Sequence, residues 1–203
     1  PAIDHPLLDL PNVTVTAHLG ANTKESQREI SVQAANNAIE SARGISYPNA
    51  LNLPIDESKI PHFVKPYIEL TQKMAFLLAQ LSKSEIRSIN ITAEGEISEY
   101  LDSLQTFATV GVLAVSCGDE VNYVNANFIA KEKGIDLTTS EFSNHSGYQN
   151  KVSINITTPT GVKTISGTVF NEDVQRIVEI NGFPLDIEPK GKMIIMRNHD
   201  VPG

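Results

Sequence analysis

Cysteine, positive charge and long apolar runs are all scarce in this sequence. The one cysteine, Cys117, excludes an internal disulfide and is typical of a reducing compartment, so we expect a cytoplasmic protein. With 16 Lys and Arg against 24 Asp and Glu, the net charge of -8 argues against a general binder of nucleic acid or anionic membranes. No apolar run reaches about 18 residues and no charged-then-apolar leader is seen, so we expect neither a membrane span nor a signal peptide.

What is present is an ordinary globular composition, 40% hydrophobic and 20% charged, over 203 residues. Such a chain has room for one or two domains with a substantial core. Cys117 ends an apolar run that begins at Val110, which predicts a buried, unreactive thiol. The chain begins at Pro1 and stops shortly after the apolar run Met193-Ile-Ile-Met196, so we expect a piece excised from a longer protein.

Residues 1–44 read as a short strand and one helix. Val13 to Thr16 predict the strand, and Asn22 with Glu25 has the spacing of a capping box. The helix is expected to end at about Gly44. Residues 45–62 contain three prolines and predict a linker.

The rest of the chain predicts helices first and strands later. Apolar residues recur at helical spacing after Pro66, which suits a first helical position. Expected helices cover about 66–81, 98–117 and 124–134, and expected strands cover 86–93, 135–142, 151–158, 162–171, 174–180 and 192–198. The predicted fold class is α+β, with two or three helices on one face of a mainly antiparallel sheet and the N-terminal strand and helix as an appendage.

His18 is the first candidate for chemistry. It follows the predicted strand and stands close to Gly20, which would let a ligand approach the backbone, so it suits a general acid or base. A structural or solvated histidine is the alternative. The other histidines have no Cys or His neighbours at metal-ligand spacing, so no metal site is predicted.

Several segments together resemble a known family. Asn12-Val-Thr-Val-Thr-Ala-His-Leu-Gly-Ala-Asn-Thr23 resembles the last catalytic signature of the D-2-hydroxyacid dehydrogenases. Later segments resemble the long-form D-3-phosphoglycerate dehydrogenases, in the right order: Lys65-Pro-Tyr-Ile-Glu-Leu70, Val124-Asn-Ala-Asn-Phe-Ile-Ala-Lys-Glu-Lys-Gly-Ile135, Ser166-Gly-Thr-Val-Phe170 and Arg176-Ile-Val-Glu-Ile-Asn-Gly182.

The resemblance implies a division of the chain. Residues 1–44 would be the end of the catalytic region, and 45–62 the linker. Residues 63–191 would be the intervening, allosteric substrate-binding domain, and 192–203 the first strand of an ACT regulatory domain.

The resemblance also assigns roles. His18 matches the family's catalytic histidine, which moves the hydroxyl proton while hydride passes to NAD, and Leu19, Gly20 and Ala21 match the loop along the nicotinamide. The family usually has proline where Ala17 stands. No Gly-x-Gly-x-x-Gly phosphate loop is present, and the family's catalytic Glu and Arg are absent, so we expect no turnover by this chain alone.

Effector sites are implied as well. Arg176, Lys131, Lys133 and Lys151 are candidates for binding a phosphate-bearing effector, against the alternative of a solvated face with scattered cations. Asn198 and Asp200 match positions where family members bind serine between subunits; polar groups at a strand end are the alternative.

Three functions stay open at this point. The first is part of an NAD-dependent oxidation of 3-phospho-D-glycerate to 3-phosphooxypyruvate, the first step of L-serine biosynthesis, in a homo-oligomer (dimer or tetramer). The second is a non-catalytic regulatory or assembly module, such as the one beside iron–sulfur L-serine dehydratases. The third is a plain dimerisation domain without a ligand.

Overall fold

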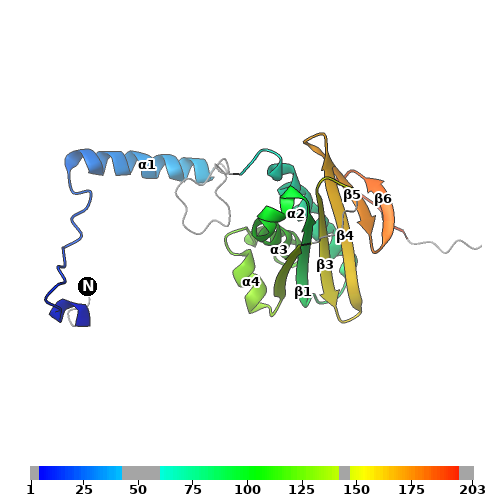
Figure 1. Ribbon diagram of the computed structural model, residues 1–203, viewed down its shortest axis with the longest axis horizontal. Helices are drawn as coiled ribbons and strands as arrows, with labels where there is room; N and C mark the ends of the chain where they lie inside the picture. The colour runs from blue at the N-terminus through cyan, green and yellow to red at the C-terminus, as the bar shows by residue number, and fades with distance from the viewer. Residues whose placement is uncertain (1–4, 43–59, 142–146, 197–203) are drawn as a thin grey trace, which may run out of the picture. The chain divides into compact units, whose positions relative to one another are not determined.

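The computed structural model of the chain describes residues 5–42, 60–141 and 147–196, and the chain divides into two compact units, residues 1–51 and 52–203 (Figure 1). Most of the predicted linker and the predicted helix end at Gly44 lie outside the described residues. Each unit is considered by itself.

The first unit contains the short 3-10 helix η1 (Pro6–Asp9) and the helix α1 (Lys24–Ala42). The strand predicted at Val13 to Thr16 is wrong, because a strand needs a neighbour for its hydrogen bonds and the described residues of this unit supply none. The helix cap also differs from the prediction. Ser26 donates its backbone N–H to Thr23 Oγ1 at 3.2 Å, so Thr23 caps α1 in place of Asn22.

The second unit is an α+β sandwich, which confirms the predicted fold class. Its helices are α2 (Val64–Ser82), η2 (Glu96–Tyr100), α3 (Leu101–Cys117), η3 (Gly118–Glu120) and α4 (Ala126–Glu132). Its strands are β1 (Ser88–Glu94), β2 (Asp136–Glu141), β3 (Lys151–Thr158), β4 (Gly161–Phe170), β5 (Val174–Ile180) and β6 (Phe183–Ile187). The strand order is β2-β1-β3-β4-β5-β6, and the helices lie on one face (Figure 1).

The sheet is antiparallel except at one edge. β1 and β2 are parallel, and a parallel pair cannot be joined by a tight turn, so α3 and α4 make the crossover between them. The other pairings in the sheet are antiparallel. β5 and β6 meet through Asn181 and Gly182, whose φ angles of +50° and +81° form the primed turn that suits a two-residue hairpin.

Two predicted boundaries at the ends of this unit need correction. Residues 192–196 form no strand, and 197–198 lie outside the described residues; the edge of the sheet is β6, which the sequence did not predict. Pro184 in β6 is tolerated because an edge strand leaves one side unpaired. Pro66 is the third residue of α2 rather than the first, but it remains in the first turn, where backbone N–H groups have no intrahelical partner.

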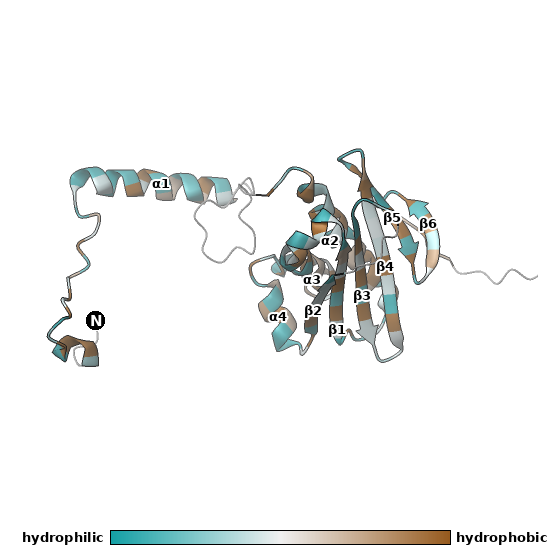
Figure 2. Ribbon diagram, viewed as in Figure 1, coloured by the Kyte–Doolittle hydropathy of each residue, from teal (hydrophilic) through white to brown (hydrophobic). Residues whose placement is uncertain are grey.

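The core lies between α2 and the helix-facing side of the sheet. Figure 2 shows apolar and polar residues alternating along β1 and β3, as expected for strands with one buried face. Fully buried side chains in this layer include Leu70, Met74, Leu78, Ile89, Ile91, Ile154, Ile156 and Ile165. Burying each such side chain contributes about 1.5–3 kcal/mol, so this layer is the main source of stability.

α3 is the most apolar helix of the unit. By length and composition alone, the helical segment Glu96–Glu120 is the one part of the described chain that could cross a membrane. Its buried residues, among them Leu104 and Leu113, are packed in the core of the second unit, and core helices of soluble proteins pass the same test. The segment is therefore explained as a core helix.

α2 packs closely against α3 and β4, because each of these two elements has a glycine at the contact. A Cβ on Gly111 of α3 would collide with the Gln72 carbonyl oxygen and would lie 2.9 Å from Ala75 Cβ, both on α2. A Cβ on Gly167 of β4 would lie 2.6 Å from the Met74 sulfur. Neither glycine has a positive φ, so close packing rather than backbone conformation explains both residues.

Gly111→Ala tests this packing. Alanine is about 1 kcal/mol better than glycine inside a helix, which alone would stabilise α3. Because the new methyl group meets backbone atoms, overpacking should cost about 1–3 kcal/mol and outweigh that gain. Urea denaturation should show a lower unfolding midpoint, whereas Ser103→Ala on the same helix should leave it nearly unchanged. A stabilised Gly111→Ala variant would contradict the packing described.

Candidate functional site

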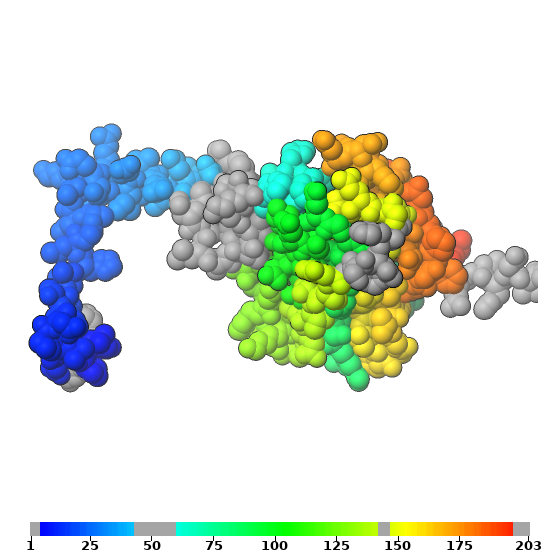
Figure 3. Space-filling view, in the orientation of Figure 1, coloured from blue at the N-terminus to red at the C-terminus, as the bar shows by residue number. Residues whose placement is uncertain are grey.

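The His18 loop lies in the first unit, between η1 and α1. No helix or strand is formed over residues 13–19, and every residue from Thr14 to Gly20 is exposed; the segment is drawn in blue in Figure 3. His18 and Ala21 have left-handed φ angles of +55° and +62°. Non-glycine residues adopt this region at a cost of about 1–2 kcal/mol each, so the loop is not in a relaxed conformation.

Chemically, the loop offers one exposed imidazole and an open backbone. A Cβ on Gly20 would meet nothing within 4 Å, so a flat ligand could lie against this part of the chain. Among the residues that the structure describes, no hydrogen bond or ion pair orients His18. A general acid or base is usually oriented by a second group, and the described residues supply no such group for His18.

The four predicted effector cations do not form one cluster. Lys151 is paired with Glu94 across β1 and β3, with Nζ 4.0 Å from Oε1 and side-chain exposures of 13% and 7%. Arg176 on β5 has its Nε 3.5 Å from Oδ1 of Asp186 on β6. Each of these two cations already has a carboxylate partner.

The other two candidates lie at the end of α4. Lys131 is in its last turn and Lys133 is its C-cap, and both are exposed. Asn198 and Asp200, the predicted serine-binding residues, lie outside the described residues. Within the described ranges, no group of three or more His, Cys, Asp and Glu residues is arranged to hold a metal ion.

Lys151 is the first residue of β3, and hydrogen bonds fix the chain on either side of it. The neighbouring Asn150 accepts the Ile97 N–H at Oδ1, at 3.0 Å, and its carbonyl accepts the Thr168 hydroxyl at 2.6 Å. The Tyr67 hydroxyl from α2 donates to the same carbonyl at 3.2 Å and accepts the Val169 N–H at 3.1 Å. The Tyr67 hydroxyl thus links the residue before β3 to β4 through hydrogen bonds, and it connects α2 to the sheet.

The turn after β1 packs against the residues just before β3. Gly95 has a φ of +82°, and a Cβ there would collide with the Gln149 carbonyl oxygen. Only glycine satisfies both the backbone conformation and the close approach. The Glu94–Lys151 pair therefore lies in a closely packed part of the domain. Its pairing with Glu94 explains Lys151 without a ligand.

An open cleft lies at the opposite end of α2. It is about 470 Å³ in volume and lies among the last turns of α2 and α3, the segment before β1 and the residues before β2. Its polar lining residues are Lys83, Ser84, Glu85, Ser116 and Lys133. Lys133 is the only one of the four predicted cations in this lining.

Sequence reasoning missed Lys83. It is the C-cap of α2 and has a left-handed conformation, with φ of +48° and ψ of +12°. That position usually carries glycine. The sequence has no glycine between the helix predicted to end near Leu81 and the strand predicted from Ile86. This absence was the available signal that another residue takes the left-handed conformation at the helix end. The helix end fixes the backbone of Lys83, from which the flexible side chain carries its positive charge.

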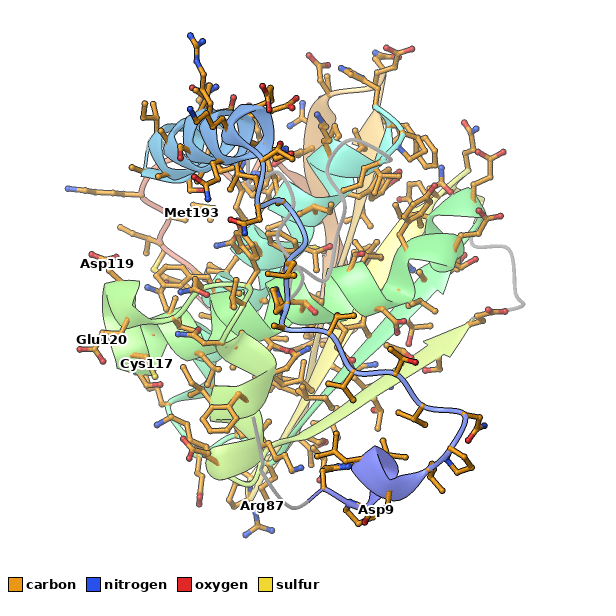
Figure 4. All side chains as sticks on the ribbon, turned by 90° about the vertical axis from the view of Figure 1, so that its left-hand side faces the viewer. Asp9, Arg87, Cys117, Asp119, Glu120 and Met193 are labelled. Carbon is orange, nitrogen blue, oxygen red and sulfur yellow. The ribbon has the colours of Figure 1, made fainter. Side chains whose placement is uncertain are left out.

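Cys117 is half-buried rather than buried as predicted. It ends α3, and Figure 4 shows it near Asp119 and Glu120 at that end of the helix. The apolar run that suggested burial is interrupted at its end because α3 stops at Gly118, whose φ is +58°. Its Sγ lies 3.5 Å from Ser116 Oγ.

Replacing Lys151 and Arg176 in turn tests whether the buried ion pair of Lys151 stabilises the fold more than the exposed ion pair of Arg176. Lys151→Met removes the ammonium group that lies 4.0 Å from the nearly buried Glu94 carboxylate, and removing one partner of a buried ion pair typically costs about 3–5 kcal/mol. Arg176→Met removes a more exposed pair, and such pairs contribute about 0–1 kcal/mol. Urea denaturation of both variants should give a much larger loss for Lys151→Met, and equal losses would contradict the close packing described.

Comparison with known proteins gives the family. Residues 63–181 match the model of the D-3-phosphoglycerate dehydrogenase intervening domain. The chain is similar to proteins named D-3-phosphoglycerate dehydrogenase: 34% identical to that of Bacillus subtilis (100% of this chain, 39% of that protein), 28% to that of Synechocystis (97% and 36%) and 31% to that of Mycobacterium leprae (100% and 39%). The chain thus spans about two fifths of the length of these relatives. Through residues 63–181, it belongs to the D-3-phosphoglycerate dehydrogenase intervening domain family.

Proposed function

We propose that this chain is part of an NAD-dependent oxidoreductase that converts 3-phospho-D-glycerate to 3-phosphooxypyruvate, the first step of L-serine biosynthesis. The observation that carries the proposal is the similarity along the whole chain to proteins named D-3-phosphoglycerate dehydrogenase. The His18 loop precedes the intervening domain in the same chain, and a regulatory module alone would not need that loop.

In this proposal His18 takes the proton from the substrate C2 hydroxyl. NAD would supply the hydride acceptor. His18, Leu19, Gly20 and Ala21 would lie along the nicotinamide, and a Cβ built on Gly20 meets nothing within 4 Å. The rest of the dinucleotide does not fit this chain, because the sequence contains no glycine-rich phosphate loop. The described residues therefore supply a proton-transfer group and one wall of the site.

The domain layout and the partners are part of the same proposal. Residues 1–44 close the catalytic region, 45–62 link it to an intervening regulatory domain at 63–191, and 192–203 begin an ACT domain. The family match at 63–181 supports the central assignment. The protein would be a cytoplasmic homo-oligomer whose effectors are 3-phosphoglycerate or another phosphate-bearing anion and, through Asn198 and Asp200, serine.

Activity measurements test the catalytic proposal. The 203-residue chain, given NAD and 3-phosphoglycerate, should produce no NADH, because the phosphate loop and the substrate-binding arginine are missing. In the full-length protein, His18→Asn should lower kcat by about 10²–10⁴-fold, the usual contribution of general acid–base catalysis.

The control for that experiment is His62→Asn, which removes another exposed histidine and should leave kcat unchanged. NADH production by the 203-residue chain, or a full-length His18→Asn enzyme with unchanged kcat, would contradict the proposed role.

A non-catalytic regulatory or assembly module, like that beside iron–sulfur L-serine dehydratases, is the second candidate. One observation favours it: the second unit has its own continuous hydrophobic core, built from α2, α3 and the sheet. Such a domain could serve more than one enzyme. The sequence that precedes Pro1 in the gene discriminates, since a dinucleotide-binding fingerprint there supports the dehydrogenase alone.

A further inference from the structure

We propose that two copies of this chain pair through the open edge of β2, antiparallel and about a two-fold axis, so that their two sheets become continuous. The inference rests on the homo-oligomer of the proposed function and deepens it, because it names the surface at which two copies meet. That surface consists of β2 (Asp136–Glu141) and the neighbouring helix α4 (Ala126–Glu132).

β2 ends the sheet with backbone groups that have no partner among the residues that the structure describes. Its neighbour on one side is β1, and no described strand lies on the other side. The Asp136 N–H bonds to the Arg87 carbonyl at 2.9 Å, on the β1 side. Because backbone groups point alternately to the two sides of a strand, those of Leu137, Thr139 and Glu141 point to the open side. This edge is therefore a ready template for another strand.

The two edges of the sheet differ in how well they are protected from pairing. β6, at the other edge, contains Pro184, and its register with β5 shifts between Ile177 and Glu179. Proline and such irregularities are common means by which an exposed edge avoids another strand. β2 contains no proline or lysine, and its register with β1 is unbroken along the whole strand. Most of its side chains are exposed, so the strand is accessible.

The order of charges along this segment favours a second copy over an unrelated strand. Lys131 and Lys133 come just before β2, and Glu141 ends it. Among the described residues, none of these three side chains forms an ion pair. In antiparallel pairing the start of one strand lies beside the end of the other, so each Glu141 approaches the two lysines of the opposite copy. Self-pairing thus brings opposite charges together twice, which is the complementarity that selects a partner.

Two registers align the open backbone groups over most of β2. One pairs Leu137 with Thr139 of the second copy, and the other pairs Thr139 with itself across the two-fold axis. In neither register does a charged residue of β2 lie opposite a like charge. The hydroxyls of Thr138 and Ser140 accept hydrogen bonds from Asn90 Nδ2 at 2.9 and 3.3 Å, so the outer face at this edge is polar and uncharged. Such a face continues from one copy to the other without repulsion.

Strand pairing alone gives a small interface, and α4 adds apolar surface next to it. Ile129 of α4 and Leu137 of β2 pack on the same hydrophobic cluster, and Figure 2 shows the helix at this edge of the sheet. Phe128 on α4 is 63% exposed. A specific dimer usually buries about 1,200–2,000 Å² in total, so we expect α4 to contribute together with the strand edge.

Sedimentation velocity of the 203-residue chain over a wide range of concentration tests the inference, and the unchanged chain should show a monomer–dimer equilibrium. Thr139→Pro removes an N–H that points away from β1, so the fold should tolerate it as edge strands tolerate proline. The pairing would lose a hydrogen bond and meet the ring, which should weaken dimerisation by about tenfold or more. Thr139→Val keeps the N–H and the branched shape, and it should dimerise as the unchanged chain does. Circular dichroism checks that each variant is folded.

A charge variant tests the same surface without proline. Glu141→Lys should weaken the dimer, because it brings a third positive charge to Lys131 and Lys133 of the other copy. Adding Lys133→Glu should restore part of the affinity. A chain that is monomeric at every concentration overturns the inference, and so does a dimer that Thr139→Pro and Glu141→Lys both leave unchanged. These measurements contain no NAD or substrate, so a failure here is distinct from a failure of the kcat test of His18.

Discussion

The close approach of α2 to both of its neighbours is the constraint on which the rest of the second unit depends. Gly111 lets α3 lie directly against α2, and Gly167 admits the Met74 side chain from α2 to the surface of β4. A bulkier residue at Gly111 would push α2 and α3 apart, and one at Gly167 would move α2 away from the sheet. The position of α2 in turn determines both polar regions of the domain, one at each of its ends.

At the N-terminal end of α2, the Tyr67 hydroxyl closes the gap between β3 and β4, beside the Glu94–Lys151 pair. At the other end, Lys83 lies on the rim of the cleft. The two ends differ in a way that suggests different roles. The first is closely packed and hydrogen-bonded, whereas the second is open, and its two lysines have no ion-pair partner among the residues that the structure describes.

Local patterns in the sequence predicted the parts of the fold that local interactions determine. The alternation of Val152, Ile154 and Ile156 predicted β3, and Asn181-Gly182 predicted the turn that precedes β6. The failures concern pairing. The segments 13–16 and 192–196 have strand-like sequences, but strands form only where a neighbour supplies hydrogen bonds, and no propensity reveals whether that neighbour is present.

The candidate site shows the same division between local patterns and distant contacts. A motif was enough to single out His18 as a candidate. Whether Lys151 and Arg176 are available to a ligand depends on their pairing with Glu94 and Asp186, which the sequence does not show. Lys83 becomes notable only because it lines the cleft.

The proposed function places proton transfer at His18 in the first unit and a regulatory role in the second. The most direct measurement is the kcat of the full-length His18→Asn protein with 3-phosphoglycerate and NAD, beside that of the unchanged protein. A fall of about 10²–10⁴-fold is expected if His18 transfers the proton. An unchanged kcat would contradict the proposed function.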